Sequence, residues 1–157
     1  MPSDEQLGLV ATKIRYVQIA ATAMVLVVCF LTPVMLQISN WKFSSASPKM
    51  LTIIAGFASL MLFSMSFSIP KIFSGSPAPG LTGKAAIDSA FGMFTTETFI
   101  QFALLEGAAL MNLIVYSVDH LIASLVVVVI TVILMLIFFP RTGRANSAIN
   151  KKLGSRQ

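Results

Sequence analysis

Residues 99–118 read FIQFALLEGAALMNLIVYSV, a run of twenty mostly apolar residues with one carboxylate, Glu106, near its middle. As an α-helix that rises about 1.5 Å per residue, the run is about 30 Å long, the thickness of a bilayer's hydrocarbon core. An ionised side chain at that depth costs at least about 2.5 kcal/mol, so intramembrane carboxylates are neutral, paired or turned towards a polar cavity. Any specific hypothesis about function has to account for Glu106.

The whole chain has the composition of a membrane protein. Of its 157 residues, 56% are hydrophobic and 11% are charged, and the mean hydropathy is +0.86, which does not suit a soluble surface. The single cysteine, Cys29, gives no disulfide framework and no cysteine cluster for a metal. One histidine, one cysteine and one intramembrane carboxylate do not form a catalytic constellation. The sequence therefore predicts that the protein has no cofactor and no metal site and is not an enzyme.

Three further apolar runs, at 16–38, 50–69 and 121–139, accompany the run at 99–118, and Glu106 is the only charged residue in the four. The predicted fold class is all-α: an integral membrane four-helix bundle made of two antiparallel helical hairpins, in which Asp119 caps the fourth helix. The four-span membrane domain covers residues 16–140. A short segment, 1–15, precedes it and a basic tail, 141–157, follows it.

The longest predicted connection is residues 71–98, because its first part is rich in glycine and proline, which break regular structure. Within it, apolar residues at helical spacing indicate a possible short helix at 84–94 that lies in the membrane interface. Thr95 or Thr96 is then expected to cap the helix of the third span.

The distribution of basic residues predicts the orientation. With four spans, both termini and the 71–98 loop lie on one side with nine lysines and arginines, whereas the other side has only Lys42 and Lys49. The positive-inside rule predicts that both termini face the cytoplasm. The tail is expected to bind anionic lipid headgroups rather than nucleic acid, because no aromatic residues alternate with its charges. The predicted headgroup ligands are Arg141, Arg144, Lys151 and Lys152.

Small residues predict where helices pack. In the second run Thr52, Ala55, Gly56, Ser59 and Ser66 recur at spacings of three, four and seven, which makes a stripe that another helix backbone can approach. In the third run, small residues flank Glu106 and leave similar room. The predicted helix-packing residues are Gly56, Ser59, Ala103 and Gly107.

Two interpretations of Glu106 follow. On a helical wheel, Gln101 and Asn112 lie about 120° from Glu106, so its partner has to come from another helix, a water molecule or its own backbone. In the first interpretation a protonated Glu106 is buried in helix packing by an interhelical hydrogen bond. In the second, Glu106 binds a proton or a cation. The residues assigned to polar packing or ion binding are Gln101, Glu106, Asn112 and Tyr116.

The sequence Ala103-Leu-Leu-Glu-Gly-Ala-Ala-Leu110, which continues to Asn112, Ile114 and Tyr116, resembles the carboxylate helix of the proteolipid (c) subunits of rotary ATPases. That resemblance implies an ion-binding subunit. The carboxylate lies on the first helix of its hairpin, however, and the polar loop of those subunits is absent. The full pattern is more similar to small bacterial four-span membrane proteins that share an A-L-L-E-G-A-A-x-x-N-L-I-x-Y third helix. That resemblance implies a bacterial inner (plasma) membrane and supplies no mechanism.

We therefore expect a small structural or accessory subunit of a membrane complex, which associates with membrane lipid and forms a homo-oligomer or binds other membrane subunits. A proteolipid-like proton- or cation-binding subunit that uses Glu106 is the alternative.

Overall fold

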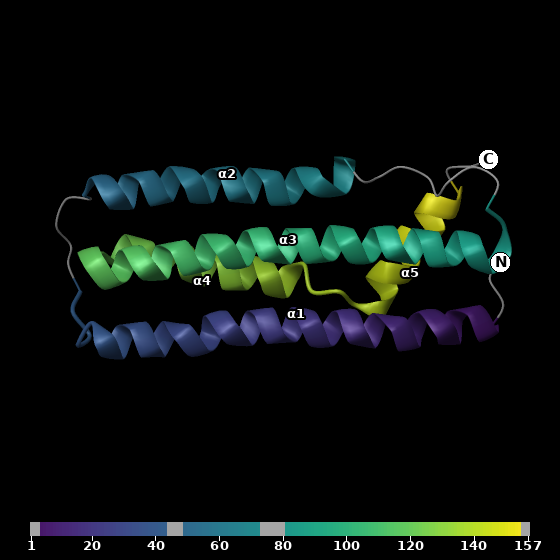
Figure 1. Cartoon of the computed structure of the whole chain (residues 1–157), viewed down its shortest axis with the longest axis horizontal. Helices are drawn as coiled ribbons and strands as arrows, with labels where there is room; N and C mark the ends of the chain where they lie inside the picture. The colour runs from purple at the N-terminus through teal and green to yellow at the C-terminus, as the bar shows by residue number, and fades with distance from the viewer. Residues whose placement is uncertain (1–3, 44–48, 73–80, 155–157) are drawn as a thin grey trace.

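The computed structural model describes residues 4–43, 49–72 and 81–154, and the regular elements in these ranges are all α-helices. This confirms the all-α prediction. The helices, shown in Figure 1, are α1 (Asp4–Ile38), α2 (Met50–Ile72), α3 (Gly83–Asp119), α4 (Ile122–Ile137) and α5 (Thr142–Gly154).

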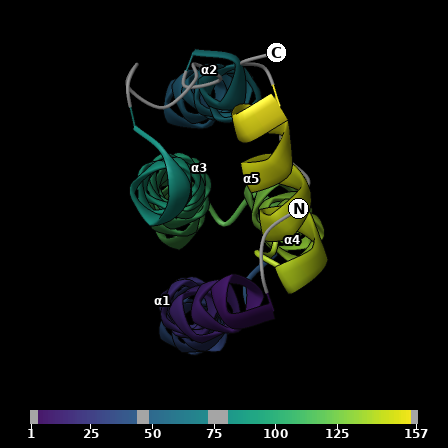
Figure 2. The same ribbon diagram turned by 90° about the vertical axis from the view of Figure 1, so that its right-hand side faces the viewer.

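Helices α1 to α4 lie along one long axis, and α3 is the helix on which the others pack (Figures 1 and 2). It contacts α1, α2, α4 and α5. Helices α3 and α4 pack against each other, but α1 and α2 do not pack against each other anywhere in the described parts of the chain. Viewed end-on, α2 and α1 lie on opposite sides of the α3–α4 pair (Figure 2). The first predicted hairpin is therefore wrong as a packed unit, because the small-residue stripe of α2 is used against α3.

Helix α3 is much longer than the predicted third span. Residues 83–98 continue the span as one helix of 37 residues, about 55 Å long. Thr95, Thr96 and Thr98 do not cap a helix end: their hydroxyls donate to the carbonyl oxygens four residues earlier, at 2.9, 3.0 and 2.9 Å. Such back-bonding lets a helix pass through threonines. The separate helix expected at 84–94 is the first part of α3, and residues 73–80 of the predicted loop lie outside the described residues.

The first part of α3 packs with the start of α1 and with α5, and we call this region the cap. The predicted basic tail is mostly helical, and α5 places its apolar side here. Two ion pairs join the cap, Lys13 to Asp88 at 2.7 Å and Lys152 to Glu97 at 2.5 Å. The buried residues of the cap core are Ile14, Val17, Ile87, Ala90, Phe91, Phe94, Ala145 and Ile149.

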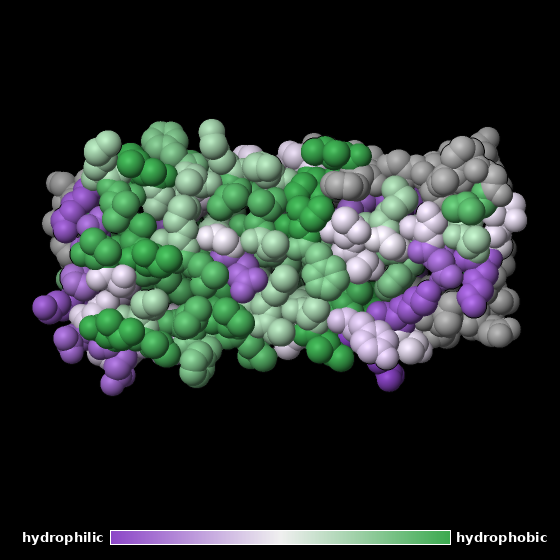
Figure 3. Space-filling view, viewed as in Figure 1, coloured by the Kyte–Doolittle hydropathy of each residue, from purple (hydrophilic) through white to green (hydrophobic). Residues whose placement is uncertain are grey.

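Next to the cap, the molecule presents an apolar surface that could contact lipid. Figure 3 shows an apolar band along most of the bundle, with hydrophilic residues at the two ends. Helices α1, α2 and α3 are long and apolar enough to cross a membrane. Helix α4 has 16 residues and is bent by 68° from α5, so it counts as a further span only together with its continuation. The fold thus has three helices, or up to four, that are able to span a bilayer.

Candidate functional site

A row of hydrogen bonds joins α2 to the membrane-spanning part of α3. Positions 52, 59 and 66 are seven residues apart and therefore lie on one face of α2, opposite the antiparallel α3. The bonds have lengths of 2.6 to 3.3 Å and join Thr52 to Asp119, Asn112 to Ser59, and Gln101 to the backbone carbonyl of Ser66. These polar residues hold two helices of the same chain together.

Three of the four residues assigned to polar packing or ion binding have partners inside the chain. The Asn112 amide also donates to the carbonyl oxygen of Ala108 at 2.8 Å, and the Tyr116 hydroxyl donates to that of Lys42 at 2.8 Å. Gln101, Asn112 and Tyr116 are all buried. Gln101 and Asn112 bond to α2, on a side of α3 away from Glu106 as the helical wheel predicted, and Tyr116 bonds to Lys42, so the three do not form a common site with Glu106.

Glu106 lies at the edge of an uncovered side of α3. On one side of it Phe102 and Leu113 are buried, and on the other Ala103 and Gly107 are exposed. Glu106 itself is partly exposed, and no hydrogen bond or ion pair joins it to any residue that the structure describes. The interpretation in which Glu106 is buried in packing within its own chain does not fit this position.

We define the open face of α3 as Ala103, Glu106, Gly107, Leu110 and Ile114. A Cβ atom added at Gly107 would have nothing within 4 Å, so the described chain leaves this position uncovered. Leu110, at the border of the face, packs against the buried cluster of Val28, Ala109, Leu113 and Val128. Figure 2 shows no helix over the outer side of α3, and Figure 3 shows a small hydrophilic patch inside the apolar band. Ala103 and Gly107, which were predicted to pack against a helix, are exposed and no helix of the described residues covers them.

The small-residue stripe of α2 divides in two. Ala55 and Ser59 are buried, and Ser59 accepts the hydrogen bond from Asn112. Gly56 is partly exposed, and an added Cβ there would also have nothing within 4 Å. Gly56 is therefore not needed for the close approach of α2 and α3.

The end of the bundle opposite the cap has its own charged pair. Asp119 ends α3, and its carboxylate accepts a hydrogen bond from Thr52 at 2.8 Å and pairs with Lys49 at 3.2 Å. It does not cap α4, whose N-cap residue is Leu121 and has no side-chain cap bond. The chain can turn here because His120 takes a left-handed conformation, with φ of 54°. Asp119 thus ties the start of α2 to the end of α3.

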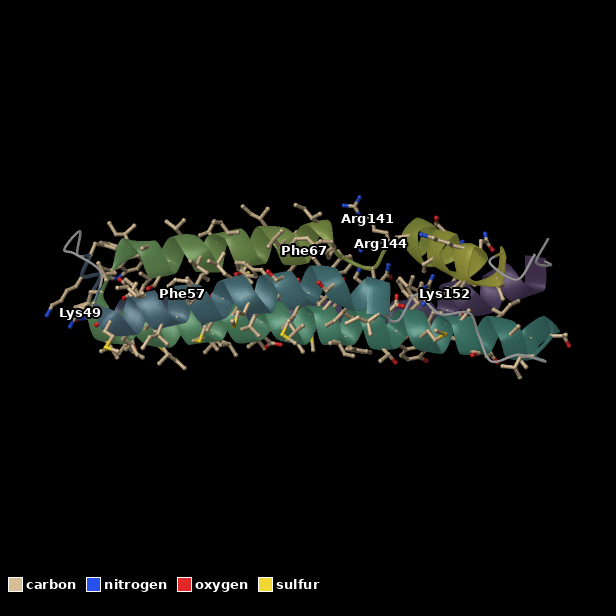
Figure 4. The ribbon with its side chains drawn as sticks, turned by 90° about the horizontal axis from the view of Figure 1, so that it is seen from above. Lys49, Phe57, Phe67, Arg141, Arg144 and Lys152 are labelled. Carbon is tan, nitrogen blue, oxygen red and sulfur yellow. The ribbon has the colours of Figure 1, made fainter. Side chains whose placement is uncertain are left out.

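The predicted headgroup residues behave differently from one another. Lys152 is buried and paired with Glu97, so it does not reach a lipid headgroup (Figure 4). Arg144 is exposed, donates to the carbonyl oxygen of Phe138 at 2.9 Å and lies 5.2 Å from the centroid of that residue's ring. Arg141 and Lys151 are exposed. Sequence reasoning missed the Lys152–Glu97 pair because 55 residues separate its members.

A groove of about 300 Å³ lies between α1 and α4, but it offers no group that would orient a polar ligand. Its one hydroxyl, that of Thr32, donates to the carbonyl oxygen of Val28 at 2.8 Å. Within the described ranges, no group of three or more His, Cys, Asp or Glu residues could hold a metal ion. The lining residues are Cys29, Thr32, Pro33, Leu36, Val128, Val129, Val132 and Ile133.

Comparisons of this chain with protein-family models, with curated proteins and with solved structures find no match. The class therefore rests on the fold alone, which is that of a small all-helical protein with three or four helices apolar enough to span a membrane. Within that class, its distinguishing feature is a carboxylate that has no partner in the described chain and borders an open face of the central helix.

Proposed function

We propose that this protein is a small multi-pass membrane subunit that assembles with other transmembrane helices, and that the open face of α3 is its assembly surface. The observation that carries the proposal is Glu106, a carboxyl group inside an apolar span with no hydrogen-bond or ion-pair partner in the described chain. A helix from outside the chain can supply that partner.

The energetic argument concerns hydrogen bonding in hydrocarbon. A charged Glu106 is expensive at mid-membrane, and even a protonated one leaves a donor and an acceptor unsatisfied, which costs several kcal/mol where nothing can bond to them. Ala103 and Gly107 beside it are small and exposed, so a second backbone can come close enough for a hydrogen bond to form. The open face therefore suits a helix better than lipid chains.

The outer surfaces of the other helices differ in kind from the open face. Large apolar side chains cover the outer sides of α1, α2 and α4, as expected for contact with lipid. On α3 the large exposed apolar residues are only Ile114 and Val118 among those that the structure describes. The contrast supports lipid contact for α1, α2 and α4 and helix contact for α3.

We further propose that the protein lies in a bacterial inner membrane with both termini cytoplasmic. The start of α1 and the end of α5 lie at the same end of the bundle, which suits an even number of spans (Figure 1). In the sequence, nine of the eleven lysines and arginines fall in the terminal segments and the 71–98 segment, and the other two precede α2, which supports a cytoplasmic cap. Arg141 and Lys151, which are exposed beside the apolar band, are available to lipid phosphates.

The alternative, in which Glu106 binds a proton or a cation, stays a prediction. Glu106 is partly exposed and has no partner among the described residues, so an ion would have access to its carboxylate. The nearest polar side chains of the same helix, Gln101 and Asn112, are committed to α2 and cannot join it as ligands. An ion site would need further ligands from elsewhere.

Photocrosslinking in native membranes tests the assembly surface. The photoreactive amino acid p-benzoylphenylalanine would replace Ile114, which is 58% exposed on the open face, or Phe57, which is 67% exposed on α2 (Figure 4) and serves as the matched control. We expect a protein adduct from position 114 and only lipid adducts from position 57. Lipid adducts alone at both positions would contradict an assembly role for the open face.

A further inference from the structure

We infer that the helix covering the open face belongs to a second copy of this chain, so that two α3 helices pack in parallel and the two Glu106 side chains pair with each other. This inference rests on the proposed function and specifies the partner. In this arrangement one copy leaves Glu106 without a partner, and the second copy supplies that partner.

The first argument concerns depth. A partner for Glu106 has to present a hydrogen-bonding group at the same level of the span, in a region where the chain has no other charged residue. A second copy with the same orientation, related by a two-fold axis along the membrane normal, brings its own Glu106 to that level by symmetry. A different protein would need a polar or basic residue at that depth, and a basic residue would itself be costly to insert.

The second argument concerns hydrogen-bond balance. A protonated carboxyl group has one O–H donor and a carbonyl oxygen that accepts. Two such groups facing each other exchange two O–H···O bonds, and each then has its donor and one acceptor satisfied. The pair is neutral, so neither copy has to place a charge in hydrocarbon.

The third argument concerns spacing along the helix. Residues 99, 103, 106, 110 and 117 recur with steps of three, four or seven, the spacing of the contact line of two parallel supercoiled helices. All five are partly or fully exposed, whereas Leu113, which belongs to the same series, is buried in its own chain. In a symmetric parallel pair, residues on this line face their own counterparts, so Glu106 meets Glu106. Ala103 lies one turn away and is small enough for a close approach.

Disulfide crosslinking between copies tests the geometry. In a Cys29→Ser background, single cysteines at Ala103 or Leu110 would be oxidised in native membranes, with a cysteine at Leu60 as the control because that side chain is 62% exposed on the outer side of α2. We expect a covalent dimer from positions 103 and 110 and none from position 60. Equal dimer yields at all three positions would indicate random collision and overturn the inference.

The strength of dimerisation can be measured by energy transfer between fluorescently labelled copies in phosphatidylcholine vesicles. The protein is diluted with increasing amounts of lipid, and the loss of energy transfer gives the dissociation constant. We expect Glu106→Leu to weaken the dimer about tenfold, because interhelical hydrogen bonds in membranes contribute about 0.6 to 1.7 kcal/mol each. Glu106→Gln should dimerise within about threefold of wild type, since an amide also donates and accepts. Ala103→Leu should dissociate the dimer by bulk alone, and circular dichroism of each variant would show that its helices are intact.

The combined results separate this inference from the proposed function. A photoadduct from position 114 to a different protein, with no disulfide between copies, would overturn the second-copy partner and leave the assembly role standing. No protein adduct and no disulfide would overturn both. A dimer that Glu106→Leu and Ala103→Leu leave equally strong would place the contact elsewhere and also overturn the inference.

Discussion

Replacing Lys152 with methionine is expected to loosen α5 from the cap by about 2 to 3 kcal/mol. The ammonium nitrogen of Lys152 lies 2.5 Å from the carboxylate of Glu97, and the two side chains are only 7% and 12% exposed. Methionine keeps an apolar stem but removes the charge, which leaves the Glu97 carboxylate without this partner. Breaking a buried ion pair costs about 3 to 5 kcal/mol, and we expect somewhat less because Glu97 retains some contact with solvent.

The loosening can be measured as access to the buried side of α5. A cysteine at Ile149, a buried residue of the cap core, would be placed in a Cys29→Ser background and labelled with a maleimide. If labelling requires α5 to open, the labelling rate should rise about 30- to 150-fold in Lys152→Met, since each 1.36 kcal/mol is a factor of ten. The double variant Glu97→Gln/Lys152→Met also removes the unpaired charge, so most of the protection should return.

Two results would refute this reasoning. If Lys152→Met is labelled no faster than the parent, the ion pair does not hold α5 in place. If the double variant is labelled as fast as the single one, the unpaired carboxylate of Glu97 is not the cause of the loosening of α5. The cause is then lost packing or another contact of Lys152.

Four further predictions follow from the same contacts. A double-mutant cycle on Asn112→Ala and Ser59→Ala should give a coupling of about 0.6 to 1.7 kcal/mol in unfolding measurements in bilayers, and no coupling would contradict their 2.6 Å hydrogen bond. Gly56→Ala should stabilise the protein by about 0.5 to 1 kcal/mol in the same assay, because the added methyl group has nothing within 4 Å. Ser147→Cys should react with an impermeant maleimide only after the inner membrane is opened, and labelling in intact cells would reverse the orientation. If Glu106 binds ions, dicyclohexylcarbodiimide should modify wild type and not Glu106→Gln, whereas an unreactive, folded wild type at every pH would remove that alternative.

The sequence pattern predicted the contacting face of α2 better than it predicted the boundaries of α3, but it did not identify α3 as the partner of that face. Thr52, Ser59 and Ser66 repeat every seven residues, a local signal that names one face of a helix, and the structure uses that face against α3. The start of α3 could not be placed in the same way. A threonine at a helix start and a threonine bonded back inside a helix look alike in a sequence, and Thr95 and Thr96 are of the second kind.

Long-range pairing was the other limit. In the sequence, Glu97 precedes an apolar run, which is typical of a helix start. Lys152 lies among other basic residues, which is typical of a tail that binds lipid headgroups. Their pairing depends on how α5 folds back onto α3, and nothing within either segment encodes it. The small residues Ala103 and Gly107 indicated a surface that a helix can approach, but composition does not say whether that helix comes from the same chain.

The length of α3 gives it a mechanical role. This helix has no proline and runs without a break for 37 residues, from the ion pairs of the cap to the Asp119–Lys49 pair at the other end. From Glu97 to Asp119 the helix is about 33 Å long, so a pivot of about 5° at Glu97 moves the far end by about 3 Å. A change in how α5 packs against Glu97 near one end of the bundle would therefore shift the α2–α3 junction at the other end, because no break in the helix absorbs the motion.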